Sequence, residues 1–402
     1  MTTPMLFPDD RQFWFETLRV LGQADFGGAE VGEALAAAAQ IKPGDYDSWH
    51  DAWYALAERL RAEAGAAAAA GHRITARDSY LRASTYYRSA EFFLHGNPDD
   101  PRIDRSYFAS VDCFHAYAEL SGLSIEPVRI PYEHTVLYGY LYRPAGQTGP
   151  RPTIVMHSGY DGAAEEMHFN GALPGVERGY NVLAFDGPGQ PAARHRDGLL
   201  FRPDWEHVVG PVLDWLLDQP GVDAARTGLL GVSLGGLLAP RAAAFEPRLA
   251  ACVAVDGVYR FGAAAEQHDI AGPDGPDGRD GPGTPPNPTV RWAIDQAKYV
   301  LGVRSAGDFA QLSQQYSLAG GIAERIACPT LVCEAEDDMF FAGQPQELYD
   351  HLTCPRELMR FTTAEGAGAH CHIGAQRLAY DRIFDWLDGI LAPAEYTLAP
   401  GA

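Results

Sequence analysis

Residues 228–240, GLLGVSLGGLLAP, place a serine between two glycines directly after an apolar run. Gly231, Ser233 and Gly235 form the pattern G-x-S-x-G, and an Ala- and Leu-rich segment follows. A serine held on a sharp turn between a strand and a helix needs small neighbours two positions away, and its hydroxyl then projects above the sheet. The pattern therefore predicts a nucleophile at Ser233. The alternative is an ordinary structural serine at the start of a helix.

Around this stretch, from about residue 127, short β-rich runs alternate with helical stretches, which is typical of a doubly wound, mostly parallel sheet. The run VRIPYEHTVLYGYLYRP indicates an antiparallel pair of strands. Buried strands are expected in PTIVMHSG, NVLAFDGPG, TGLLGVS, LAACVAVDG and CPTLVCEAED, with a last one near ELMRFTT, and amphipathic helices at 204–218, 234–246, 343–351 and 374–390. The predicted fold class is α/β.

Residues 9–125 carry helical patterns throughout. In the third helical segment, one face recurs at spacings of four and three and is expected in the core: Ala76, Tyr80, Ala83, Tyr87, Ala90 and Leu94. A second stripe contains Arg82, Tyr86, Ser89 and Phe93. This stripe is either a partly exposed flank or, if the helices cover an active site, a pocket lining in which Arg82 and Tyr86 bind substrate.

These patterns predict two domains, a helical N-terminal cap at 1–125 and a catalytic domain at 126–402. The segment 257–325 breaks the alternation and is interpreted as a mostly helical insertion, a natural place for a lid. Within it, GPDGPDGRDGPG at 272–283 has Gly at every third position, which is the collagen period. Four triplets are too few for a triple helix, so we interpret 272–288 as a loop.

Charge and composition exclude several classes of function. The formal net charge of −22 disfavours contact with phosphate backbones and anionic lipid surfaces, so neither nucleic acid nor a membrane is expected as a partner. No apolar run approaches the roughly 20 residues that span a bilayer. The first residues, MTTPMLFPDDRQFW, carry two acids where a secretory signal has basic residues. We expect a cytoplasmic protein that acts on a small molecule.

The six cysteines include no CxxC pair and indicate reduced thiols rather than a disulfide framework. Cys371 lies between two histidines, but this spacing is typical of no metal site, so no metal is expected. No organic cofactor is expected either, because serine, histidine and bound water suffice for the chemistry.

A serine hydroxyl is a poor nucleophile at neutral pH, so the chain must supply a histidine base and a carboxylate that orients it. Residues 331–341, LVCEAEDDMFF, offer an acid at the end of a strand, and residues 365–374, EGAGAHCHIG, offer a base before the last helix. The order serine, acid, histidine is the one that this type of serine turn requires.

Each of the two segments contains a pair of candidates. We predict Asp337 as the acid because it follows the strand directly, with Asp338 as the alternative. We predict His370 as the base in preference to His372, because the small residues GAGA before it leave the loop free to bend towards the serine.

An oxyanion formed by attack on a carbonyl needs backbone N–H donors. The first should be Leu234, at the N-terminus of the helix that follows the serine. The second should come from HSGYDG at 157–162, where Gly159, Tyr160 and Asp161 let the backbone approach a substrate oxygen. Tyr160 N–H with Leu234 N–H is the predicted oxyanion pair, and Gly159 and Asp161 are predicted substrate contacts.

In these residues and motifs, the sequence resembles α/β-hydrolases of the 2,6-dihydroxypseudooxynicotine hydrolase and fermentation–respiration switch type. It is similar in particular to bacterial and fungal polyketide-shortening hydrolases that act on a heptaketide. The likeness covers nearly the whole chain and is carried by YLRASTYYRSAEFFL, HSGYDG, GVSLGG, FEPRLAAC, CPTLVCEAEDD and GAHCHIG.

The resemblance implies that Ser233, Asp337 and His370 act on a ketone beneath a helical cap, and that a carbon–carbon bond beside a carbonyl is hydrolysed through an acyl-serine. It also implies a homodimer. The pyridine-cleaving members carry an additional acid after the EPRLAAC segment, where this chain offers Glu266 without a clear match. A polyketide-derived or hydroxyaromatic substrate is therefore preferred over a nicotine-type one.

Other functions stay open at this point. The same three residues serve an esterase, a lactonase, or an acyltransferase or cyclase of a secondary-metabolite pathway. A non-catalytic small-molecule binding protein is the alternative from a different class, and a peptidase is disfavoured because the helical cap suits small molecules.

Overall fold

The computed structural model describes residues 6–146, 149–268, 270 and 287–391. Its centre is one eight-stranded sheet of order β1-β2-β4-β3-β5-β6-β7-β8, in which β1, β2 and β4 pair antiparallel and all other neighbours pair parallel. This confirms the predicted fold class. The strands are β1 (Ser124–Tyr132), β2 (Thr135–Arg143), β3 (Arg151–His157), β4 (Asn181–Asp186), β5 (Val222–Val232), β6 (Ala251–Val255), β7 (Thr330–Ala335) and β8 (Arg356–Phe361).

Alternating side chains of the central strands fill two cores, one on each face of the sheet. In β3, Val155 belongs to the core that contains α8 and α9, whereas Ile154 and Met156 belong to the core that contains α6 and α14. Both faces are covered, which explains why these strands consist almost entirely of apolar residues. The flanking helices are α6 (Ala172–Glu177), α7 (Pro191–Asp197), α8 (Glu206–Leu217), α9 (Gly235–Ala243), α13 (Gln344–His351) and α14 (Gln376–Leu391).

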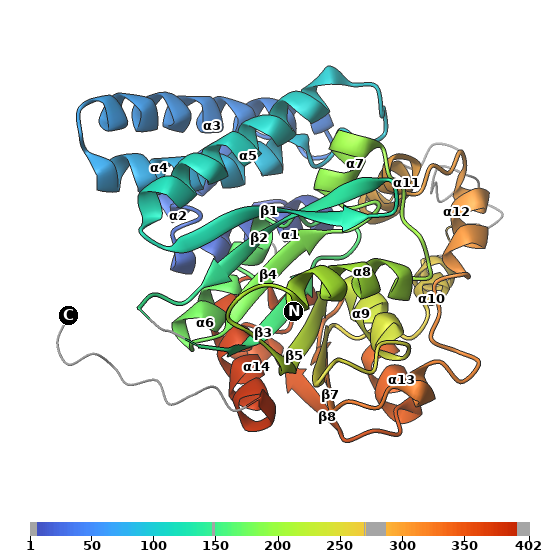
Figure 1. The fold of residues 1–402 in the computed structure, drawn as a ribbon. Coiled ribbons are helices and arrows are strands. Elements are labelled where there is room, and N and C mark those ends of the chain that lie inside the picture. Colours follow the sequence, from blue (N-terminus) through green and yellow to red (C-terminus); the bar gives the residue numbers. More distant parts are fainter. Residues whose placement is uncertain (1–5, 147–148, 269, 271–286, 392–402) are drawn as a thin grey trace.

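The N-terminal third is helical, as its patterns predict. Helices α3, α4 and α5 form a layer at the β1 side of the sheet (Figure 1). Asp10, Asp45 and Asp100 each accept a hydrogen bond from a backbone N–H of the helix that follows, so three of the helix starts have an aspartate cap. The helices are α1 (Arg11–Gly22), α2 (Val31–Ala38), α3 (Tyr46–Ala69), α4 (Arg73–Glu91) and α5 (Pro101–Ser121).

Between β6 and β7 the described residues include the α-helices α10 (Phe261–Gln267), α11 (Pro288–Val300) and α12 (Ala306–Ser313). They gather at one end of the molecule (Figure 1). The predicted loop at 272–288 lies outside the described residues except for its last two positions. Among the helices that the structure describes, none is both long and apolar enough to span a bilayer.

Candidate active site

The serine turn has the predicted geometry. β5 ends at Val232, Ser233 has a φ of +63°, and α9 begins at Gly235. A Cβ atom at Gly231 would collide with the carbonyl oxygen of Gly235, and one at Gly235 would lie 2.8 Å from the carbonyl oxygen of Ser158. Both flanking glycines are therefore required by the close approach of backbone, and the strained serine is held by its surroundings.

His370, predicted as the base, reaches the serine from the loop before α14. His370 Nε2 lies 2.9 Å from Ser233 Oγ, and its Nδ1 lies 2.9 Å from Asp338 Oδ2. The preference for His370 over His372 thus agrees with the geometry. His372 is fully buried, and its Nδ1 lies 3.1 Å from the Ala367 carbonyl oxygen.

The acid beside His370 is Asp338, so the preference for Asp337 is corrected. Glu336 N–H donates to the Phe361 carbonyl and Asp337 N–H to the Gly368 carbonyl. The backbone thus stays hydrogen-bonded to the segment that follows β8 for two residues beyond β7. Asp338 N–H donates to the Ala335 carbonyl, so residues 335–338 form a turn after β7, and this turn directs the carboxylate of Asp338 towards His370. Asp338 Oδ1 also accepts from the N–H groups of Phe340 and Phe341, which fixes its orientation.

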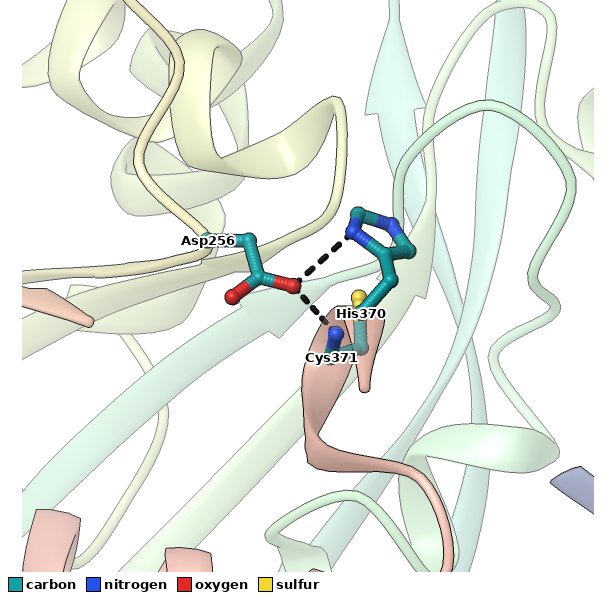
Figure 2. A group of neighbouring side chains, drawn as sticks. All are labelled: Asp256, His370 and Cys371. Carbon is teal, nitrogen blue, oxygen red and sulfur yellow. Dashed lines mark hydrogen bonds and ion pairs between the residues drawn. The ribbon is translucent and has the colours of Figure 1, made fainter. Parts of the chain in front are cut away.

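A second carboxylate, which the sequence analysis missed, also lies beside this histidine. Asp256 directly follows β6, is fully buried, and places Oδ2 2.9 Å from His370 Nδ1 (Figure 2). The same oxygen accepts a hydrogen bond from Cys371 N–H. The available signal was an aspartate at the carboxyl end of a buried strand, next to the strand that carries Asp338.

The two carboxylates outweigh the effect of burial on His370. Burial by itself favours the neutral imidazole, but the negative charges of Asp338 and Asp256 hold the pKa of His370 well above its ordinary value. The pKa of Asp256 is lowered: burial works against its charge, and His370 and His372 overcome this effect. Burial lowers the pKa of His372, which therefore stays neutral.

Asp256, His370 and Cys371 bring three potential metal ligands within 4.8 Å of one another (Figure 2). Asp256 Oδ2 already accepts from Cys371 N–H, and His370 Nδ1 lies within hydrogen-bond distance of two carboxylates. The carboxylate oxygen and the imidazole nitrogen are thus engaged within the protein, so we assign the cluster to orientation of the histidine rather than to a metal.

The proposed oxyanion donors lie at the serine turn. A Cβ at Gly159 would be 2.5 Å from Leu234 N, so the loop after β3 packs directly on the start of α9. Within the described part of the chain, neither Tyr160 N–H nor Leu234 N–H donates a hydrogen bond to a protein group. Gly159 therefore serves the packing of this turn, and the two N–H groups stay available to an oxyanion.

Ser233 and His370 both line one pocket. The helices α1, α10, α11 and α12 all contribute residues to its lining. Aromatic rings dominate the lining, and Phe340 and Phe341 lie 4.9 and 5.4 Å from the His370 ring between centroids. The apolar lining includes Phe15, Tyr160, Phe261, Ile270, Val290, Trp292, Ala293, Phe309, Phe340 and Phe341.

The cap takes part in the pocket through α1 rather than through α4, which corrects the predicted roles of Arg82 and Tyr86. Both bond to Glu33, Arg82 Nε at 3.1 Å and the Tyr86 hydroxyl at 3.1 Å, inside the helical layer. The reason is that α4 packs between α3 and α5 and its Tyr86 stripe is also buried. The sequence analysis missed the two α1 residues of the pocket, Phe15 and Arg19.

Asp161 does line the pocket, as predicted, but it is engaged in a buried ion cluster. Arg19 lies 2.9 Å from Asp161 and 3.0 Å from Glu166, and Arg88 lies 2.6 Å from Glu166. Burial opposes the charge of Asp161, and the two arginines overcome it and lower its pKa. The cluster ties α1 and α4 to the loop after β3. Glu266, in contrast, is exposed and accepts a hydrogen bond from Gln314.

The sheet order, the serine turn and the histidine together define an α/β-hydrolase. The family model described as "Esterase FrsA-like" matches residues 48–264, and the chain belongs to this family. The predicted resemblance is thereby confirmed.

Two fungal relatives match along almost their whole length. The hydrolase LUC6 of Fusarium sp is 38% identical over 94% of this chain and 96% of its own length. The 20-hydroxy-prefusarin hydrolase FUS2 of Gibberella moniliformis is 36% identical over the same shares. Among solved structures, a 2,6-dihydroxy-pseudo-oxynicotine hydrolase aligns with a TM-score of 0.70 and 25% identity, over 95% of this chain and 98% of that one. The protein is therefore a hydrolase of this family.

Proposed function

We propose that the protein is a serine hydrolase that cleaves a carbon–carbon bond beside a carbonyl in a polyketide-like or hydroxyaromatic ketone, through an acyl-serine. The observation that carries the proposal is the continuous set of contacts from Asp338 through His370 to Ser233 at the base of an aromatic pocket. The names of two similar proteins support the substrate class, since both describe hydrolysis of hydroxylated compounds.

The geometry suits the two halves of such a reaction. In the first, His370 Nε2 takes the proton of Ser233 while Oγ attacks the ketone, and the N–H groups of Tyr160 and Leu234 receive the oxyanion. When the tetrahedral intermediate collapses, the carbon–carbon bond breaks and its electron pair leaves with the departing carbon as an enolate. The proton on His370 Nε2 then passes to that carbanion. An acyl group remains on Ser233.

In the second half, His370 takes a proton from water, and the resulting hydroxide attacks the acyl-serine. When this intermediate collapses, the bond from the acyl carbon to Ser233 Oγ breaks, Oγ takes the proton back from His370, and a carboxylic acid is released. The leaving carbon must be stabilised as an enolate, which a β-diketone or a hydroxylated ring provides. Aromatic side chains such as Phe15, Trp292 and Phe340 offer flat apolar surfaces to a ring of this kind.

Ester hydrolysis is the second candidate, because the matching family is described as esterase-like. The same residues act on an ester, a lactone or, with a substrate hydroxyl in place of water, in acyl transfer or cyclisation. These reactions share the acyl-serine and differ in the leaving group.

Intact-mass spectrometry of the protein after incubation with an acyl β-diketone tests the proposal, with Ser233→Ala as the control. We expect an acyl adduct on the wild type alone, together with both cleavage products. An adduct from simple esters but not from β-diketones would reassign the reaction to ester chemistry. A wild type that is inert to esters, β-diketones and a fluorophosphonate would instead indicate a binding protein.

A further inference from the structure

We propose that Asp256 is a second positioning carboxylate for His370, so that the imidazole is oriented by two aspartates from adjacent strands rather than by one. The inference rests on the proposed role of Ser233 as the nucleophile and His370 as its base. It adds to that function a residue that acts through the histidine.

The placement follows from the topology of the sheet. β6 and β7 are parallel neighbours, so their carboxyl ends meet at the same edge. Asp256 follows β6 directly and Asp338 follows β7 after two residues. Their Oδ2 atoms both lie 2.9 Å from His370 Nδ1. Asp338 Oδ2 is the hydrogen-bond partner of this Nδ1, and Asp256 Oδ2 lies at ion-pair distance from the same atom.

Because Asp256 and Asp338 are both buried, their contact with His370 affects the energy of each carboxylate. Asp256 is 0% exposed and Asp338 8% exposed, and a buried carboxylate without a compensating charge is costly. The other histidine near Asp256, His372, is 3.8 Å from Oδ1, and burial lowers the pKa of His372. Asp256 therefore depends on His370 for its nearest positive charge.

The charge balance around the histidine decides its basicity. With both aspartates ionised, a neutral imidazole leaves two buried negative charges, whereas an imidazolium leaves one. The second aspartate thus stabilises the protonated form, which is the form created when Ser233 attacks. A more basic His370 is a stronger acceptor for the serine proton.

Other titratable and charged groups face this histidine and its carboxylates from the elements packed around them. Cys371 and His372 lie on its own loop, Asp161 acts on it from the loop after β3, and His268 acts on Asp338 from the end of α10. Phe15, Phe340 and Phe341 provide uncharged rings.

A purely structural role for Asp256 predicts a different outcome. Asp256 also accepts from Cys371 N–H, and this contact holds a turn in which Cys371 and His372 have φ values of +53° and +56°. Asp256→Asn keeps an oxygen for that N–H but removes the charge. A turn-holding role therefore leaves the pH profile of the variant unchanged.

The test is the rate at which a fluorophosphonate labels Ser233, measured from about pH 5 to about pH 9. The variants are Asp256→Asn, Asp338→Asn and the double variant, with Asp337→Asn as the matched control and Ser233→Ala as the blank. For Asp256→Asn we expect the acidic limb of the profile to move down by about 1 to 3 pH units. Asp337→Asn should superpose on the wild type. The double variant should label more slowly than either single one.

A folded, labelled Asp256→Asn protein with the wild-type profile would overturn the inference. If the wild type itself is not labelled, the proposed nucleophile fails, which is a separate result. The ¹⁵N NMR titration of His370 in Asp338→Asn tests Asp256 in a variant that keeps Asp256 itself. A pKa above the ordinary histidine value is expected there, and a pKa at about 6.5 would overturn the inference.

Discussion

At the level of single residues, the contacts from Asp338 through His370 to Ser233 distinguish Asp338 and His370 from residues of the same type one or two positions away. Asp337 and Asp338 are adjacent in sequence, yet the carboxylate of Asp338 contacts His370 and that of Asp337 does not. His370 and His372 differ in the same way: His370 contacts Ser233, whereas His372 is buried in the core.

This arrangement predicts unequal effects of two identical substitutions. Asp338→Asn should lower kcat at least about 100-fold, since an oriented histidine is lost, although Asp256 keeps part of the orientation. Asp337→Asn should stay within about twofold of the wild type. Steady-state kinetics with a chromogenic ester measures both. Equal losses in the two variants would contradict the assignment of Asp338.

At the scale of elements, α1 is what joins the helical layer to the site. It supplies Phe15 and Arg19 to the pocket and packs against α4 and α11. Its Arg19 bonds both Asp161 and Glu166 of the catalytic part, and its Glu16 lies 3.4 Å from the same guanidinium. The position of α1 is thus coupled to that of the loop that carries Tyr160.

Removal of the central cation of this cluster should be costly. Arg19→Met leaves Asp161 and Glu166 with one arginine between them, and the free energy of unfolding should fall by about 3 kcal/mol or more. Arg19→Lys keeps the charge but not the paired contact with Glu166, so its loss should be smaller. Urea unfolding followed by tryptophan fluorescence measures both. A Met variant as stable as the wild type would refute the role of the cluster.

The same cluster predicts a pH effect on stability. Burial raises the pKa of Glu16 to about 8, against an ordinary value of 4.5. The folded chain therefore holds a proton there that the unfolded chain releases. The resulting stabilisation is fully present below about pH 4.5 and is lost as the pH rises through about 8.

Glu16→Gln carries no such proton and serves as the comparison. The free energy of unfolding of the wild type, minus that of Glu16→Gln, should decrease steadily between about pH 5 and about pH 8. Urea titrations at a series of pH values give this difference directly. A difference that rises with pH would show that Glu16 is ionised in the folded protein.

At the scale of the whole molecule, the pocket is assembled from segments far apart in the chain. Its walls come from α1, the loops after β3 and β7, the helices α10 to α12, and the turn at His370. The proposed division at 125 and 126 therefore separates two parts that share one site. The homodimer implied by the resemblance stays a prediction for analytical ultracentrifugation.

A chain that begins at Ser124 should accordingly be unreactive. It lacks Phe15 and Arg19, and it exposes the apolar surface that α1 and α4 cover. We expect the fragment 124–402 to show less than about a tenth of the fluorophosphonate labelling of the full chain, because the oxyanion loop loses its partners. Labelling equal to that of the full chain would show that the helical part is dispensable for the serine.

Much of the fold was predictable because it follows from local patterns. The apolar strand runs, the helical periodicity and the paired glycines around Ser233 each reflect physics that acts within a few residues. The short helices α6 and α7 were not anticipated, since six or seven residues give no clear period. The order of strands in the sheet was likewise absent from the local patterns.

Local sequence patterns alone predicted the α/β class, the serine turn, and the chain order of Ser233, an aspartate and His370. Only the assembled fold shows which aspartate faces His370, that Asp256 lies beside it, and that α1 rather than α4 lines the pocket. The direction of the Asp338 side chain depends on a turn after β7, and the Gly368 carbonyl of the loop before His370 holds that turn by accepting from Asp337 N–H. Asp256 and His370 are 114 positions apart in the sequence, and their contact arises from the order of the strands and from burial. Neither can be read from a short stretch of sequence.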